Sequence, residues 1–138
     1  MLKRMLLALV LVIGTAAHAT AQPLPAPKIK YAAQFPNFGF VTVELSVINW
    51  QAYSPALFVH TPQFGPCGLN PTPSRTWVNI YRVGTAIPVN VHCAIYFNGE
   101  LVRLLFATPA GSKPKFAYIT MIDRATKRVV KSNVVAIP

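Results

Sequence analysis

Residues 40–47 read FVTVELSV, and this stretch decides the fold class. Apolar residues occupy every second position, with polar residues between them: Val41, Val43, Leu45 and Val47 alternate with Thr42, Glu44 and Ser46. A period of two indicates a β-strand with one apolar face and one largely polar face. We therefore predict a strand over residues 40–50.

Further strands are predicted on both sides of this stretch, at residues 28–33, 76–83, 89–97, 100–106, 115–122 and 129–137. Residues 35–40 contain Pro36 and Gly39 and indicate a turn packed with aromatic side chains. Residues 61–75 and 108–114 are rich in Pro and Gly, which favours loops.

The dipeptide Asn98-Gly99 stands between two of the predicted strands. Asn-Gly flanked by apolar alternation is the strongest local signal for a β-hairpin. A two-residue loop here would pair Cys93 with Leu104 and would place Cys93 on the core-facing side.

No stretch of the chain shows a sustained helical period with capping signals. About seven to eight short strands separated by frequent turns are typical of an all-β, antiparallel β-sandwich. We predict a sandwich of the immunoglobulin or fibronectin type.

The composition supports a folded protein with one domain. The chain has 138 residues, of which 53% are apolar and 12% are charged. This hydrophobicity excludes a disordered chain, and the length suits a single core.

The N-terminus has the three parts of a secretory signal peptide. Lys3 and Arg4 precede an apolar run at residues 6–13, and overlapping A-x-A sites end at Ala21. A membrane anchor is the alternative, but the run is shorter than the roughly 20 residues that a span needs. We predict a signal peptide at residues 1–21, a Pro-rich extended leader at 22–27, one domain at 28–138, and a periplasmic or secreted location.

Export determines how the two cysteines are interpreted. In an oxidising compartment, Cys67 and Cys93 are expected to form one disulfide. Two free thiols, or a metal site with His60 and His92, are the alternatives, but the spacing matches no zinc signature. We predict no metal and no cofactor.

Few groups of the predicted mature chain could perform catalysis. Its carboxylates are Glu44, Glu100 and Asp123, and its imidazoles are His60 and His92. The carboxylates fall on separate elements, so the paired acids of a glycosidase are absent. Neither a G-x-S-x-G elbow nor a phosphate-binding loop is present. We predict a protein that is not an enzyme, in which Asp123 caps the backbone N–H two residues further on.

Positive charge is the other notable feature of the sequence. Lys and Arg number 13 against 3 Asp and Glu, a formal net charge of +10. Six cations near the C-terminus form a candidate patch for an anionic ligand: Lys113, Lys115, Arg124, Lys127, Arg128 and Lys131. The alternative is a surface that only keeps the protein soluble. Nucleic acid is not expected as a specific partner, because no nucleic-acid module is visible.

Two pairs of aromatic residues have two interpretations. Trp50 and Tyr53 flank a strand end, and Trp77 and Tyr81 share one strand face. Exposed, such residues form a sugar-binding platform; buried, they fill a sandwich core. We predict that they belong to the core.

A set of short motifs extends over most of the predicted mature chain. They are Asn49-Trp50-x-x-Tyr53, Leu57-Phe58, Pro66-Cys67-Gly68, Ser74-Arg75-Thr76-Trp77-Val78-x-Ile80-Tyr81, Cys93, Leu104-x-Phe106-Ala107, Asp123-Arg124 and Ser132-Asn133. In these the chain resembles small secreted bacterial proteins of unknown function. The resemblance implies a β-sandwich with one disulfide and no catalytic residues.

These observations favour a non-enzymatic binding module for a protein or an anionic polymer of the cell envelope. The alternative is an inhibitor of, or a protector against, a secreted enzyme. In that case the loop 61–75 would block the active site of the enzyme. A hydrolase without a recognisable motif is a third interpretation, which the scarcity of carboxylates and imidazoles disfavours. No transmembrane segment is expected in the mature chain.

Overall fold

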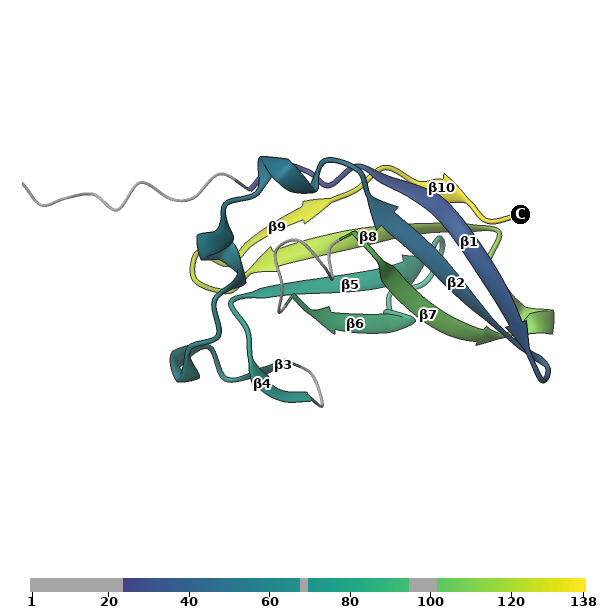
Figure 1. Cartoon of the computed structure of the whole chain (residues 1–138), viewed down its shortest axis with the longest axis horizontal. Coiled ribbons are helices and arrows are strands. Elements are labelled where there is room, and N and C mark those ends of the chain that lie inside the picture. The colour runs from purple at the N-terminus through teal and green to yellow at the C-terminus, as the bar shows by residue number, and fades with distance from the viewer. Residues whose placement is uncertain (1–23, 68–69, 95–101) are drawn as a thin grey trace, which may run out of the picture.

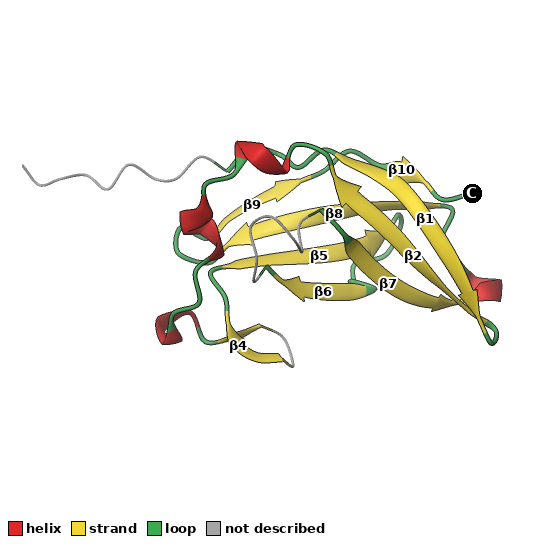
Figure 2. Ribbon diagram, in the orientation of Figure 1, coloured by secondary structure: helices red, strands yellow, loops and turns green. Residues whose placement is uncertain are grey.

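A computed structural model describes residues 24–67, 70–94 and 102–138. The predicted signal peptide lies outside these residues, as do Asn98-Gly99 and Glu100. The described chain is all-β and antiparallel, which confirms the predicted class (Figures 1 and 2). Its strands are β1 (Ile29–Asn37), β2 (Phe40–Val47), β3 (Pro66–Cys67), β4 (Asn70–Pro73), β5 (Thr76–Arg82), β6 (Asn90–Cys93), β7 (Leu104–Pro109), β8 (Phe116–Asp123), β9 (Arg128–Lys131) and β10 (Val135–Ala136).

Two larger sheets contain most of the strands. One sheet has the order β1-β2-β7, and the other has the order β10-β8-β5-β6, with β9 also paired to β8. Buried residues of both sheets form one apolar cluster, so the sheets pack face to face (Figure 1). β3 and β4 form a separate small hairpin.

Short 3-10 helices lie in the connections (Figure 2). They are η1 (Trp50–Ala52), η2 (Pro55–Phe58), η3 (Pro62–Phe64) and η4 (Ala110–Ser112). Within the described ranges, no helix reaches the length and apolar character that crossing a bilayer would require. The segment predicted as a loop, 61–75, contains η3 and the β3–β4 hairpin.

The alternation in residues 40–47 is confirmed, but the predicted strand over residues 40–50 is too long, since β2 ends at Val47 and Trp50 begins η1. Val43 and Leu45 have no exposed surface, while the alternate residues Thr42 and Glu44 are partly exposed. β2 is the central strand of its sheet, and Val43, Leu45 and Val47 belong to the core.

The turn at residues 35–40 differs from the prediction. β1 continues to Asn37, and only Phe38 and Gly39 lie between it and β2. The aromatic side chains are exposed rather than packed, because the strand register places Phe35 and Phe40 on the outer face.

The predicted pairing of Cys93 with Leu104 is wrong. β6 pairs with β5 and β7 pairs with β2, so the two strands belong to different sheets. The Trp77–Cys93 pairing places Cys93 on the outer face of its sheet, away from the core. An apolar alternation reports which residues share a face, but not which face is covered by the second sheet.

The inward positions of β6 are partly polar, and this has a physical reason. β6 and β7 are neighbouring edge strands of the two sheets, so their backbones need additional hydrogen-bond partners. The Asn90 amide donates to the Leu105 carbonyl over 2.7 Å, and His92 Nε2 donates to the same oxygen over 2.9 Å. These two side chains join the sheets along one edge.

At the opposite edge of the sandwich, the Asn133 side chain is hydrogen-bonded to the backbone of β1. The Asn133 side chain accepts from the Ile29 N–H over 2.8 Å and donates to the Ile29 carbonyl over 2.9 Å. Ser132 also replaces a normal ladder bond, because its hydroxyl accepts from the Ile119 N–H. The single strand predicted at 129–137 is therefore divided into β9 and β10.

Candidate functional site

The outer face of the five-stranded sheet carries the aromatic residues that we predicted to be buried in the core. Val78 and Ile80 of β5 are fully buried between the sheets, whereas Trp77 and Tyr81 point outward and are partly exposed. That prediction is wrong for this pair, because β5 directs its aliphatic residues inward. Tyr53, by contrast, is buried, and its hydroxyl donates to the Pro25 carbonyl over 2.7 Å.

Tyr81, Tyr118 and Lys131 form a row across three strands of this face. The two tyrosine rings stack with centroids 5.2 Å apart and an interplanar angle of 14°. The Lys131 ammonium lies 4.1 Å from the Tyr118 ring centroid, within the range of a cation–π contact. We call these three residues the aromatic–cation row.

Polar atoms without partners lie beside the row. Trp77 Nε1, Asn79 Oδ1 and Thr120 Oγ1 are buried and have no hydrogen-bond partner in the described part of the chain. The Asn79 side chain donates to the Tyr81 hydroxyl over 3.4 Å. An unpaired buried polar atom costs free energy, so this part of the face is the least well satisfied beside the row.

Arg124 is bonded within the protein. Its guanidinium lies 4.8 Å from the Trp77 ring centroid and donates to the carbonyl oxygens of Gly65 (3.0 Å) and Ser74 (3.2 Å). It holds the segment around β3 against the sheet. We therefore assign Arg124 a structural role and do not count it among the cations available to a ligand.

The structure separates the six predicted patch cations along β8. Lys113 and Lys115 precede β8, whereas Arg124, Lys127 and Arg128 lie at its far end. β8 has eight residues, which span roughly 23 Å at the usual strand rise. Lys131 lies between the two ends, because it pairs with Thr120 and its ammonium lies over the Tyr118 ring. Lys127, Arg128 and Lys131 are exposed.

Asp123 is fully buried and is held by a network. Arg75 forms a two-pronged ion pair with it, with N–O distances of 2.9 and 3.1 Å. The Ala125 N–H and the Thr126 hydroxyl donate to it over 3.0 Å each, which confirms the predicted cap. Burial alone would raise the pKa of the carboxyl, but the hydrogen bonds and the charge of Arg75 outweigh burial and lower it.

Glu44 makes the second ion pair of the described residues. Arg103 approaches it with N–O distances of 3.1 and 3.2 Å on the outer face of the three-stranded sheet. The hydrogen bond and the charge of Glu44 raise the pKa of the Arg103 guanidinium. Both described carboxylates are therefore already paired with arginine.

The histidines do not form a metal site with the cysteines. His92 donates to a backbone carbonyl, and Cys67 and Cys93 lie at disulfide distance with their Cα atoms 5.7 Å apart. The described residues contain no group of three His, Cys, Asp or Glu that could hold a metal ion. The Cys67–Cys93 pair links the β3–β4 hairpin to β6.

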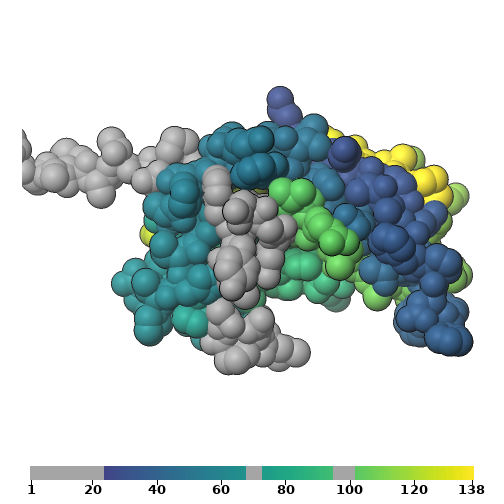
Figure 3. All heavy atoms as spheres, in the orientation of Figure 1, coloured from purple at the N-terminus to yellow at the C-terminus, as the bar shows by residue number. Residues whose placement is uncertain are grey.

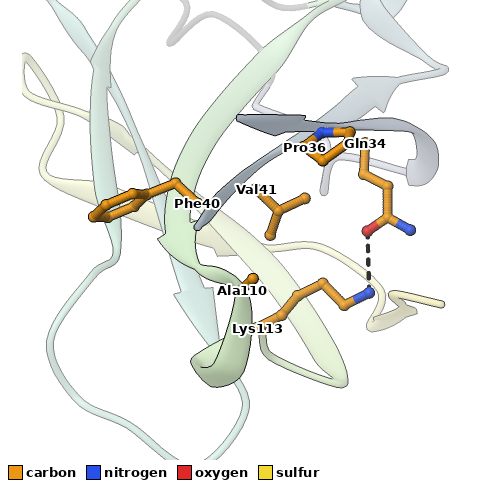
Figure 4. Close-up of a pocket in the computed structure, with 6 residues that line it drawn as sticks. All are labelled: Gln34, Pro36, Phe40, Val41, Ala110 and Lys113. Atoms are coloured by element: carbon orange, nitrogen blue, oxygen red, sulfur yellow. Dashed lines mark hydrogen bonds between the residues drawn. The ribbon is translucent and has the colours of Figure 1, made fainter. Parts of the chain in front are cut away.

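A cavity of about 270 Å³ lies at the other end of the molecule, beside the β1–β2 turn (Figure 4). The Lys113 ammonium donates to Gln34 Oε1 over 3.0 Å at its edge and also to the main-chain oxygen of Pro138. The lining contains no carboxylate, imidazole or thiol: Gln34, Pro36, Phe40, Val41, Ala110 and Lys113.

Fold and surface together define an all-β module with one aromatic and cationic sheet face. Comparisons with protein-family models, with curated proteins and with solved structures found no match for this chain.

Proposed function

We propose that the chain is a non-enzymatic, exported β-sandwich of immunoglobulin or fibronectin type that binds an anionic polymer of the cell envelope. The ligand site is the aromatic–cation row with the exposed cation Lys127 of the β8–β9 turn. Arg128 is not included, because it pairs with Asp123 and so lies on the opposite face of β9 from Lys131. The partner is a polymer with sugar rings and acidic groups, because aromatic faces stack on rings and ammonium groups pair with acids.

The observation that carries this proposal is the placement of Lys131 over Tyr118, itself stacked on Tyr81. A cation on an aromatic face is held in position before a ligand arrives, which reduces the entropy lost on binding. Neither described carboxylate competes for this cation, because Asp123 is buried against Arg75 and Glu44 is paired with Arg103.

Two further observations support the wider proposal. The paired carboxylates, and a cavity lining without a carboxylate, imidazole or thiol, support a role in binding rather than catalysis. The cysteine pair at disulfide distance supports an oxidising, extracytoplasmic location, together with the signal-peptide pattern of residues 1–21.

Retention on a sulfated-polysaccharide column tests the site. We expect the protein to bind at low salt and to elute as salt screens the charges. The double variant Lys127→Ala/Lys131→Ala should elute at clearly lower salt than the wild type. Tyr118→Leu should also weaken retention, because it removes the ring below Lys131.

The matched control removes two exposed cations from another region. Lys28→Ala/Lys30→Ala has the same net charge as the test variant and changes residues beside and within β1. It should elute closer to the wild type. Equal losses in the two double variants would mean that only net charge matters and would contradict the proposed site.

A second function, inhibition of a secreted enzyme, is favoured by the β3–β4 hairpin. This hairpin projects from the sandwich (Figure 1) and is held by the Cys67–Cys93 pair and by Arg124. A projecting, tethered segment suits insertion into an active site. Added protein should then lower a proteolytic, lytic or glycosidic activity of an envelope extract, and Cys67→Ala/Cys93→Ala should lose this effect.

A further inference from the structure

The β1–β2 turn has a backbone that does not suit its first residue. Phe38 has φ 45° and Gly39 has φ 81°. Positive φ at both central residues defines a type I′ turn, in which Asn-Gly is favoured and a bulky side chain at the first position is strained. The Gly39 carbonyl accepts from the Ala110 N–H over 2.9 Å, which ties the turn to η4.

The Phe38 side chain makes no contact that could offset this strain, since it is fully exposed. Phe35 and Phe40 are about half exposed beside it, on the same outer face of the β1–β2 ribbon. Figure 3 shows this turn projecting beyond the body of the molecule. Three phenylalanines thus form a convex apolar tip, which we call the phenylalanine tip.

Cations lie close behind the phenylalanine tip. Lys113 lines the cavity that Phe40 also lines (Figure 4), and exposed Lys115 is two residues further along. Lys113 is bonded to Gln34 and to the main-chain oxygen of Pro138, so the exposed Lys115 is the cation available here. Glu44 and Asp123 do not offset Lys115, because Glu44 is paired with Arg103 and Asp123 is buried at the opposite end of β8.

We propose that this end of the molecule docks on the surface of an anionic phospholipid bilayer. The phenylalanine tip enters the boundary between headgroups and acyl chains, and the exposed Lys115 contacts the lipid phosphates. A convex apolar tip backed by an exposed lysine matches both layers of such a surface, apolar inside and anionic outside. The strained turn serves this docking, because it places an aromatic ring at the outermost point of the hairpin.

This membrane site is independent of the aromatic–cation row, and vesicle co-sedimentation tests it. The protein without its signal peptide contains every described contact. It should bind vesicles of phosphatidylglycerol and phosphatidylcholine and bind pure phosphatidylcholine vesicles much more weakly. Phe38→Asn should weaken binding by about tenfold or more, since a phenylalanine no longer enters the bilayer. Its melting temperature should be unchanged or higher, because Asn suits the turn.

Two control variants distinguish binding through the membrane site from nonspecific adsorption to vesicles. Ile48→Asn removes an apolar side chain that is about half exposed just after β2, at the opposite end of that strand, and should bind vesicles like the wild type. Lys115→Gln should weaken binding about fivefold on the anionic vesicles only. Lys127→Ala/Lys131→Ala should keep vesicle binding, and Phe38→Asn should keep polysaccharide retention.

Absence of vesicle binding by the wild type would overturn the proposal, and so would Phe38→Asn binding as tightly as the wild type. Equal binding to neutral and anionic vesicles would refute the role of Lys115. None of these results bears on the polysaccharide site, so the two proposals fail separately.

Discussion

The two ends of the sandwich differ in what their side chains are bonded to. At the end where β8 finishes, Arg75, Asp123 and Arg124 are engaged in ion pairs and carbonyl contacts, and the Cys67–Cys93 pair joins the β3–β4 hairpin to β6. At the end with the β1–β2 turn, the phenylalanine side chains point into solvent.

This difference separates residues that hold the fold from residues that are available to partners. Removing a buried, bonded group leaves its partner unsatisfied, which costs stability. Removing an exposed side chain changes stability little and affects mainly what the surface can bind. Substitutions at the first end should therefore lower stability, and side-chain substitutions at the second end should lower binding.

The largest loss is expected from Arg75→Ala, which leaves the buried Asp123 carboxylate without its cation. The free energy of unfolding should fall by about 3–5 kcal/mol, measured by urea denaturation. Arg103→Ala breaks an ion pair of the same two-pronged geometry at the surface and should shift the urea midpoint little. Similar losses in both variants would remove the distinction between the two pairs.

Breaking the covalent link should have the next largest effect. Cys67→Ala/Cys93→Ala opens a loop with a sequence separation of 26 residues and should cost about 2–5 kcal/mol. Chemical denaturation of the oxidised wild type, the reduced wild type and the variant tests this. Equal stability of all three would show that the link does not stabilise this end.

Acid should weaken the same end through Asp123. Its pKa is lowered in the folded state, whereas an unfolded Asp titrates near about 3.9. The unfolded chain therefore takes up the proton first, and the stability that Asp123 contributes is lost as the pH falls below about 4. Unfolding measured against pH should show a steeper acid loss for the wild type than for Asp123→Asn, and parallel curves would contradict the assignment.

The smallest expected loss lies at the other end, in the backbone of the β1–β2 turn. Gly39→Ala places a Cβ in open space but keeps the positive φ, so the cost is conformational, about 1–2 kcal/mol. Gly111→Ala is the matched control, because its Cβ also meets nothing and its φ is not positive. A thermal melt in which both variants are equally stable would argue against a fixed turn.

Sequence patterns predicted the parts of the fold that depend on local chemistry. The alternation in β2 is buried as predicted, and Asp123 caps the turn that it opens. Both depend on neighbours within a few residues, so the sequence contains all the information that they need.

Patterns failed where the outcome depends on distant segments. The alternation through Cys93 identified a shared face, but the β3–β4 hairpin, not the other sheet, covers that face. The candidate patch was predicted from proximity along the chain, whereas the length of β8 separates Lys113 and Lys115 from Arg124, Lys127 and Arg128. The stacking of Tyr81 on Tyr118 depends on strand pairing, which no local signal reports.

Mapping a ligand by NMR tests the central claim most directly. An acidic, sulfated oligosaccharide would be titrated into the labelled protein, and amide chemical shifts would be followed. The account predicts that the largest shifts fall on β8, β9 and the turn between them, around Tyr118 and Lys131, with the β1–β2 turn unchanged. Shifts spread over all exposed cations, or centred on the β1–β2 turn, would contradict it.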